Sequence, residues 1–289
     1  MKKHLAFIKS SIFQAWMYKF NVIGWLIGSS LFTLVSIFLW HAIFSEIDSG
    51  IIVQQGIDFT FPLMVTYVLC SQIISFTINS SDTFFKLGHD IREGQIAINL
   101  TKPINYRTRM RDECLGNYIG FSLFTSLPAT IIVFLCVHFI FGISFPFWYN
   151  IIYFFISVTL SVLIFDSFNF LFGQIAFFTG ALFGVMLIKD TFLQFFSGAM
   201  IPLSFLPTGL ADTLRILPFS SLMETPVFLL LNMYDTQGIL SFFGFTVQMN
   251  GALIGLIKIF IQFVWLIVLE TLCYSSNRRI IKHVVSVGG

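Results

Sequence analysis

The side chains in this sequence that could do chemistry are a few ionisable ones placed inside long apolar runs. Asp166 lies in the run FDSFNFLFG, three residues before Asn169. Lys258 and Glu270 lie toward opposite ends of the last apolar run. An ionisable group inside a membrane span is costly, so it commonly marks an ion or substrate path. Asp166 has two equally weighted interpretations, a hydrogen bond between helices or a place on a translocation path. Lys258 and Glu270 are expected to extend toward the two membrane interfaces.

Motifs for catalysis and metal binding do not accompany these residues. The sequence has no GxSxG nucleophile elbow, no GxGxxG fingerprint after a strand and no GxxxxGK[ST] phosphate loop. Its five histidines are scattered, and its four cysteines form no CxxC pair. We therefore expect that the chain binds no metal or cofactor. If nucleotide energy drives it, ATP and Mg²⁺ bind a separate ATPase.

The composition shows what kind of elements must position these residues. Hydrophobic residues make up 56% of the 289 residues and charged residues 10%, with 38 Phe and a mean hydropathy of +0.88. Soluble domains carry about 25% charged residues, so the composition excludes an ordinary soluble domain and predicts a membrane protein. The net charge of +2 is too small to suggest a nucleic-acid partner.

Apolar runs of helical length predict an all-α membrane protein with six transmembrane helices, since a helix needs about 20 residues to cross a hydrocarbon core of about 30 Å. Before the first span, residues 1–20 predict an interfacial helix on the inner leaflet, with a disordered basic tail as the less favoured alternative. The six expected spans are residues 22–44, 59–79, 118–141, 151–178, 191–206 and 255–274, and 191–206 is broken by Gly198 and Pro202.

Most of the 16 basic residues lie in three places: before the first span, between the second and third, and after the last. Basic residues close to spans are retained in the cytoplasm, so both termini and the basic loop 80–114 are expected there. The loop 45–58 is acidic and is expected outside. Between the fourth and fifth spans, Lys189 and Asp190 are the only charges, and we expect a cytoplasmic turn near Lys189.

Prolines and glycines give two further signals. Pro202, Pro207 and Pro218 interrupt any continuous helix, so residues 207–250 are expected to form a re-entrant external element of short helices. Four GxxxG pairs begin at Gly24, Gly116, Gly180 and Gly251. Such pairs let helix backbones approach closely, with tight packing inside one subunit favoured over a dimer interface.

The order of these elements resembles the permease subunits of type 2 ATP-binding-cassette (ABC-2) exporters. DIREGQIAINLTKPIN resembles the family's "IRxGxIxxxLxKPI" stretch, and SGAMIPLSFLP followed by LPF resembles its "SGxxIPLxFP" stretch, in a prokaryotic subfamily of about this length. The resemblance implies a subunit in the cytoplasmic membrane of a prokaryote, in a homodimer or heterodimer, with a cytoplasmic nucleotide-binding ATPase as partner.

The resemblance also implies which residues contact that ATPase. The positions that match the family's coupling helix are Asp90, Ile91, Arg92, Glu93, Gly94, Leu100, Lys102 and Pro103. Downstream of them, Arg107, Arg109 and Arg111 are expected to form salt bridges or to hold phospholipid headgroups. A solvated loop without a partner is the less favoured alternative for this block.

The expected translocation path lies between two permease subunits, with substrate contacts from the second and fifth spans, and carries an amphipathic cargo such as a lipid, peptide or hydrophobic antibiotic. Its expected residues are Phe61, Thr66, Phe76, Asp166, Asn169, Phe195, Gly198 and Met200. Two alternatives stay open. One is an ion-coupled transporter or channel that uses Asp166, and the other is a non-transport immunity or scaffold protein of the membrane.

Overall fold

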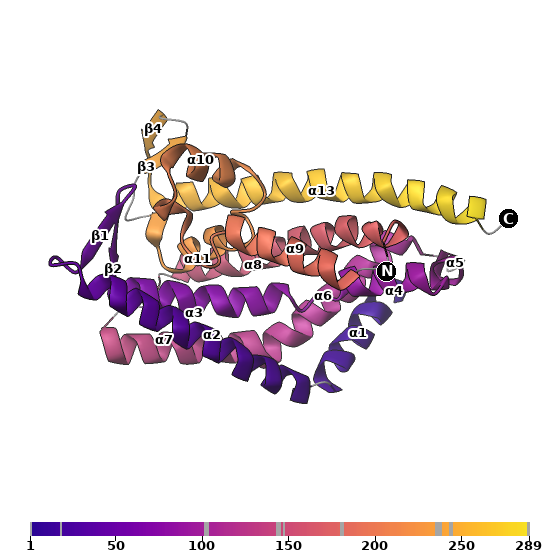
Figure 1. Ribbon diagram of the computed structural model, residues 1–289, viewed down its shortest axis with the longest axis horizontal. Helices are drawn as coiled ribbons and strands as arrows, with labels where there is room; N and C mark the ends of the chain where they lie inside the picture. The colour runs from indigo at the N-terminus through magenta and orange to yellow at the C-terminus, as the bar shows by residue number, and fades with distance from the viewer. Residues whose placement is uncertain are drawn as a thin grey trace.

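A computed structural model describes residues 2–17, 19–100, 104–142, 146, 148–179, 182–234, 239–242 and 245–287. Within these ranges the chain is mostly helical, and its long helices run along the long axis of the molecule (Figure 1). The helices of the first half are α1 (Lys2–Met17), α2 (Lys19–Ser45), α3 (Phe61–Ile78), α4 (Thr83–Arg92), α5 (Gln95–Leu100), α6 (Tyr106–Phe121) and α7 (Leu127–Phe141). Those of the second half are α8 (Trp148–Gly173), α9 (Leu182–Phe196), α10 (Thr208–Ile216), α11 (Glu224–Leu230) and α13 (Gly251–Val287).

Two antiparallel hairpins accompany the helices and were missing from the all-α prediction. Strands β1 (Ile51–Gln54) and β2 (Ile57–Thr60) pair in the loop after α2. Strands β3 (Ile239–Phe242) and β4 (Phe245–Gln248) pair before α13. Each hairpin is only two strands of four residues, so the fold class remains helical.

Four helical segments in the described part of the chain are long and apolar enough to cross a membrane. They are Phe61–Arg92, Tyr106–Phe141, Trp148–Ala176 and Gly251–Arg278. The part of α2 that can be judged, Ser30–Ser45, is shorter, and the 15 residues of α9 extend only about 22 Å. The helical membrane class is therefore confirmed, whereas six spans stay a prediction.

Local sequence signals explain where these helices begin and bend. The Thr60 side chain accepts a hydrogen bond from the Leu63 backbone N–H (3.4 Å), and Pro62 follows in the first turn of α3. Between α6 and α7, Ser122–Ser126 form a π-helical turn just before Pro128. Proline lacks the N–H of the regular ladder, so this long helix departs from α-geometry here.

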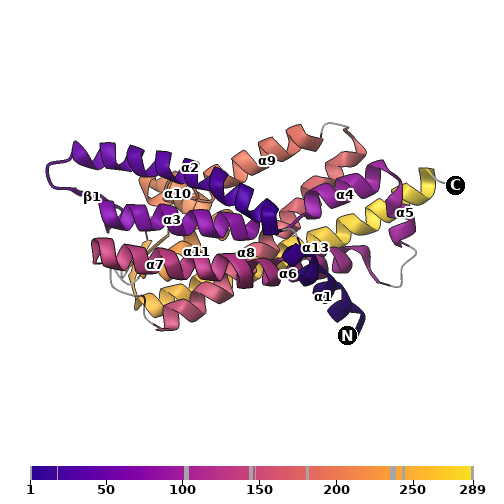
Figure 2. The same cartoon turned by 90° about the horizontal axis from the view of Figure 1, so that it is seen from below.

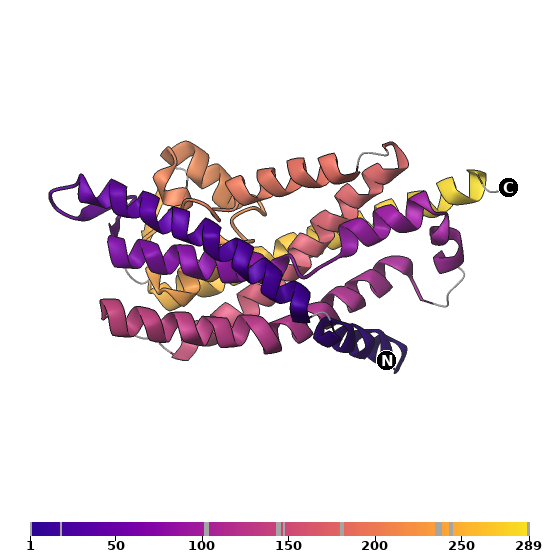
Figure 3. The ribbon, with the colours of Figure 1, turned by 60° about the horizontal axis from the view of Figure 1, so that its bottom comes forward.

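The two ends of the molecule differ in what they carry. Helices α4 and α5 and the end of α13 lie at one end, and the two hairpins and α10 lie at the other (Figure 1). The chain termini both lie toward the α4 and α5 end (Figure 2, Figure 3). We call these the coupling end and the hairpin end.

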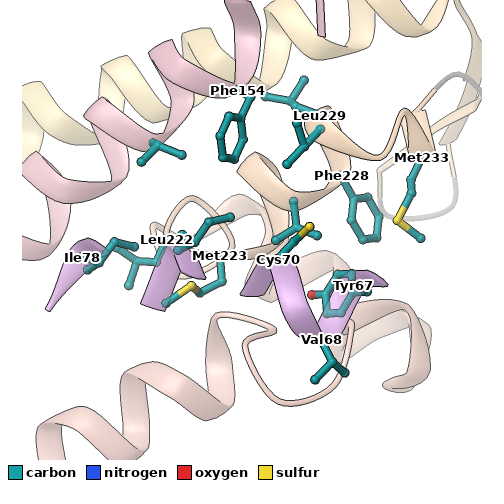
Figure 4. Close-up of a cluster of buried hydrophobic side chains, with 14 of the residues drawn as sticks. Tyr67, Val68, Cys70, Ile78, Phe154, Leu222, Met223, Phe228, Leu229 and Met233 are labelled. Carbon is teal, nitrogen blue, oxygen red and sulfur yellow. The ribbon is translucent and has the colours of Figure 1, made fainter. Parts of the chain in front are cut away.

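The main hydrophobic core joins α3, α8 and α11. Side chains of these helices point toward one another, among them Tyr67, Cys70, Phe154 and Phe228 (Figure 4). The Tyr67 hydroxyl donates a 2.6 Å hydrogen bond to the backbone carbonyl of Gly198. Gly198 has a φ of +83°, a backbone conformation that favours glycine. This bond fixes the turn after α9 against α3.

The chain after Gly198 forms short helices instead of one continuous helix, as its prolines predicted. Pro202 precedes a short 3₁₀ helix, Leu203–Phe205, Pro207 precedes α10, and Pro218 follows it. At the hairpin end, Arg215 of α10 donates to Glu224 of α11 (Nη2 to Oε1, 3.1 Å) and to Gln55 of the β1–β2 turn (2.7 Å). Burial disfavours the charge of Arg215, but the Glu224 carboxylate outweighs this effect and raises the pKa of Arg215.

The predicted turn near Lys189 is wrong. Helix α8 ends at Gly173, a 3₁₀ turn follows at Gln174–Phe177, and Lys189 lies inside α9. Its ammonium donates to Asn169, lies 2.8 Å from Asp190, and sits 5.0 Å from the ring of Phe84. A lysine satisfied in this way does not need to face water, so its charge did not mark a turn.

Helix α1 packs along α6. His4 of α1 pairs with Asp112 of α6. A Cβ added at Gly116 would lie 2.5 Å from the carbonyl oxygen of Ile8 and 2.7 Å from the Cβ of Ser11. The first glycine of this GxxxG pair therefore permits close helix packing within the subunit.

Replacing Gly116 with Ala is expected to destabilise the protein by about 1–3 kcal/mol, because the new methyl group meets backbone that cannot move aside. Thermal unfolding of the purified protein in detergent measures the loss. The matched control is Gly184→Ala on α9, where an added Cβ meets nothing within 4 Å and alanine favours the helix. Equal unfolding temperatures for the two variants would contradict the close packing of α1 on α6.

Candidate coupling site

The turn between α4 and α5 presents three exposed residues at the coupling end. Helix α4 ends at Arg92, Glu93 caps it, and Gly94 has a φ of +70°. Glycine adopts this conformation without the cost that a Cβ imposes, so the chain reverses sharply here. Arg92, Glu93 and Gly94 are all exposed. We call Arg92, Glu93 and Gly94 the coupling turn.

Asp90 and Ile91 lie on the inner side of this turn. The Asp90 carboxylate accepts hydrogen bonds from the Tyr106 hydroxyl (2.8 Å) and from Asn99 Nδ2 (2.7 Å). Arg109 donates through Nη1 to Asn99 Oδ1 (2.8 Å). Asp90 is buried and Ile91 is partly buried. These two residues therefore hold the turn in place, and the exposed residues are the ones available to a partner.

The remaining predicted coupling residues are described only in part. Leu100 is the last residue of α5, and its side chain, together with Lys102 and Pro103, lies outside the described residues. Ile98 of α5 has a 60% exposed side chain beside the coupling turn. An exposed isoleucine on a six-residue helix adds apolar surface to the charged turn.

Arg107 and Arg109 are buried, so of the two predicted roles they form salt bridges, within the subunit, and are not placed to hold phospholipid headgroups. Helix α6 begins at Tyr106, because the Asn105 side chain caps it by accepting from the Arg107 backbone N–H (3.0 Å). The Arg107 side chain is 0% exposed, and Arg109 is also buried. Arg111 is the partly exposed member of the three.

Arg107 joins two carboxylates from different helices. Its Nη1 donates to Asp166 Oδ2 of α8 at 2.7 Å, and its Nη2 donates to Glu270 Oε1 of α13 at 2.5 Å. Its Nη2 also donates to the Ser167 hydroxyl at 3.1 Å, and its guanidinium lies 4.9 Å from the ring of Phe170. We call Arg107, Asp166 and Glu270 the buried ion cluster.

The environment of Asp166 favours the first of its two interpretations. Its Oδ1 accepts hydrogen bonds from the hydroxyls of Ser81 (2.9 Å) and Thr83, which flank the start of α4. Both carboxylate oxygens are therefore used in contacts between helices. Asp166 thus forms hydrogen bonds between helices. The periodicity of the sequence did not predict that Arg107 is its partner.

Glu270 and Lys258 also differ from the prediction that they reach the two membrane interfaces. Glu270 turns inward to Arg107, and Arg111 Nη1 lies 3.9 Å from its Oε2. Lys258 is buried. The charge-assisted hydrogen bond from Arg107 compensates the Glu270 carboxylate, so this carboxylate does not have to reach the interface.

The predicted path residues do not share one surface. Thr66 is buried and its hydroxyl donates to the Pro62 carbonyl (2.7 Å), while Asn169 is buried with Lys189. Phe195 and Met200 are exposed. The others lie in separate contacts: Phe61 packs edge-on against Phe44, Phe76 against Phe121, and Gly198 against Tyr67.

Metal chemistry has no support within the described part of the chain, where no group of three or more His, Cys, Asp or Glu is placed to hold an ion. The four cysteines are free. The described residues at the coupling end are an exposed turn above a buried ion cluster.

Comparison with known proteins identifies the family. The sequence profile described as ABC-2 family transporter protein matches residues 30–276. A search of curated proteins finds no match. The profile match covers three of the four segments long enough to span a membrane and all but the last two residues of the fourth, and it includes the coupling turn and the buried ion cluster. The chain therefore belongs to the ABC-2 family of transporters, as a multi-pass membrane permease.

Proposed function

We propose that the chain is the membrane subunit of an ATP-driven exporter and that a separate cytoplasmic ATPase docks on the coupling turn. The observation that carries this proposal is the exposed turn Arg92, Glu93 and Gly94, held from beneath by the buried Asp90. A surface ordered before binding loses less conformational entropy when a partner docks. The turn therefore suits a contact that must transmit force.

The distribution of charge supports a cytoplasmic location for the coupling end. The described basic residues of α4 and of the start of α6, Lys86, Arg92, Arg107, Arg109 and Arg111, lie at that end, and Glu46 and Asp48 lie in the loop before the β1–β2 hairpin. Basic residues near spans stay in the cytoplasm. In the proposed orientation both termini are cytoplasmic, in the cytoplasmic membrane of a prokaryote.

Transport itself is proposed to use two permease subunits, identical or different, with six spans each. ATP binding to two ATPases would move the coupling turns and expose a path between the subunits to each side in turn. The exposed aromatic and apolar side chains Phe192, Phe195 and Met200 support an amphipathic or hydrophobic cargo such as a lipid, peptide or antibiotic. An ion-coupled transporter is disfavoured, because both oxygens of Asp166 are already bonded.

Affinity purification of the tagged chain in mild detergent, from the host that encodes it, tests the proposal. We expect a soluble ATPase with a phosphate loop to co-elute and the eluate to hydrolyse ATP. A tagged, unrelated multi-pass protein purified in the same way is the control. Recovery of the chain without any ATPase, or with equal ATPase activity in the control, would overturn the proposal.

A further inference from the structure

We propose that the buried ion cluster transmits movement of the coupling turn to α8 and α13, with Arg107 as the positioning residue at its centre. The inference rests on the proposed function, because it assumes that a partner moves the turn. It assigns a role to three charged residues that do not contact the partner themselves.

The first step leads from the coupling turn to α6. Asp90, two residues before Arg92, accepts from Tyr106 at the start of α6 (2.8 Å). Asn99 of α5 donates to Asp90 and accepts from Arg109 of α6. Both sides of the turn are thus bonded to the first turn of α6. A displacement of the turn must either break these bonds or move the start of α6.

The second step leads from α6 to α8 and α13. Arg107 lies in the same helical turn as Tyr106 and Arg109. It donates a hydrogen bond from Nη1 to Asp166 of α8 and another from Nη2 to Glu270 of α13. A guanidinium is planar and rigid, so its two bonds fix the relative positions of three helices.

The third step returns to α4 itself. Ser81 and Thr83 stand at the junction between α3 and α4, and both hydroxyls donate to Asp166. The start of α4 is therefore bonded to α8 directly, while its end is bonded to α6. The carboxylate of Asp166 is the point where both routes meet.

Two polar atoms of the cluster have no hydrogen-bond partner within the described part of the chain. Among the described residues, Arg107 Nε and Glu270 Oε2 are buried without a hydrogen-bond partner. Because the Nε donor of Arg107 and the Oε2 acceptor of Glu270 are unused, the guanidinium can exchange hydrogen-bond partners while its charge stays compensated. Coupling between distant sites requires such elements with more than one discrete arrangement.

Arg107→Lys tests the proposal, because lysine keeps the charge but cannot hold two carboxylates in one plane. The variant is purified with its ATPase, with Cys136→Ser and nitroxide labels at Phe38→Cys of α2, a helix outside the cluster, and at Trp148→Cys of α8, both exposed positions. We expect ATP and vanadate to shift the distance between the labels in the parent protein. In Arg107→Lys the shift should be lost, while ATPase recovery stays within about two-fold.

The control is Arg111→Lys on the same helix, which should keep the full shift. Glu270→Gln provides a second test if Arg107→Lys does not fold, and it should lose the shift as well. An unchanged shift in either cluster variant, or no shift in the parent complex, would overturn the coupling role. Failure of the parent to recover any ATPase would instead refute the proposed function.

Discussion

Replacing Arg107 with Met is expected to lower the free energy of unfolding by about 3–5 kcal/mol, the usual cost of removing one partner of a buried ion pair. The arginine is fully buried, and Asp166 and Glu270 would remain in the interior without it. Arg111 is 3.9 Å from the far oxygen of Glu270 and partly exposed, so it compensates only one of the two charges weakly. This is the largest stability effect that we expect from a single substitution in this chain.

Thermal unfolding in detergent, followed by the amount of monodisperse protein that remains, measures this loss. Arg92→Met is the matched control, since Arg92 is exposed and surface substitutions usually change stability by no more than about 0.5 kcal/mol. The triple variant R107M/D166N/E270Q should recover much of the loss, because the cost arises from charges left unpaired. If Arg107→Met unfolded at the same temperature as Arg92→Met, the pairing of Arg107 with both acids would be refuted.

The second large effect concerns binding of the ATPase. Replacing Arg92 and Glu93 together with Ala should weaken the affinity for the ATPase about 30-fold or more, since losing interface hot spots commonly costs about 2 kcal/mol or more. Both residues are exposed, and the Glu93 carboxylate pairs with His89 Nε2, 3.0 Å away in α4. We therefore expect the fold to remain intact.

Titration of the purified ATPase against the permease in detergent gives the affinity of each variant. Ala substitutions at Glu46 and Asp48 are the control, because these two acids are exposed in the loop before the β1–β2 hairpin. The control should bind as the parent does. Equal affinities for the two double variants would place the docking surface elsewhere.

The sequence predicted the parts of the fold that depend on composition and local signals. Apolar length predicted segments close to α3, α8 and α13, and Pro202, Pro207 and Pro218 predicted the short helices between α9 and α13. The coupling turn also follows from a local signal, because Gly94 sits where α4 must end. Such features are set by residues a few positions apart, so a single sequence can reveal them.

The buried ion cluster could not be predicted, because its members are far apart in the chain. Arg107 and Glu270 are separated by 163 positions, and a lone arginine in a polar block is indistinguishable from a solvated one. The expected third span consequently began at residue 118, twelve positions after the start of α6 at Tyr106. Asn105 was the available signal, since it is a favoured N-cap residue before this helix.

Lys189, in the second half of the chain, also has partners that are far from it in the sequence and could not be predicted. A lysine with an adjacent aspartate in an apolar run suggested a turn at the membrane surface. In the structure the charge is satisfied by Asn169 and Asp190 and by the aromatic rings of Phe84 and Phe165. Three of those partners, Asn169, Phe84 and Phe165, come from α4 and α8, so only the tertiary packing shows why the helix continues.

The most direct test of the central claim is photo-crosslinking in living cells. A benzophenone amino acid placed at Glu93 in the coupling turn should crosslink to the cytoplasmic ATPase. The same amino acid at Val53, a 63% exposed position in the hairpin at the other end, should not. Crosslinking from Val53, or its absence at Glu93 while the permease is active, would contradict docking of an ATPase on this turn.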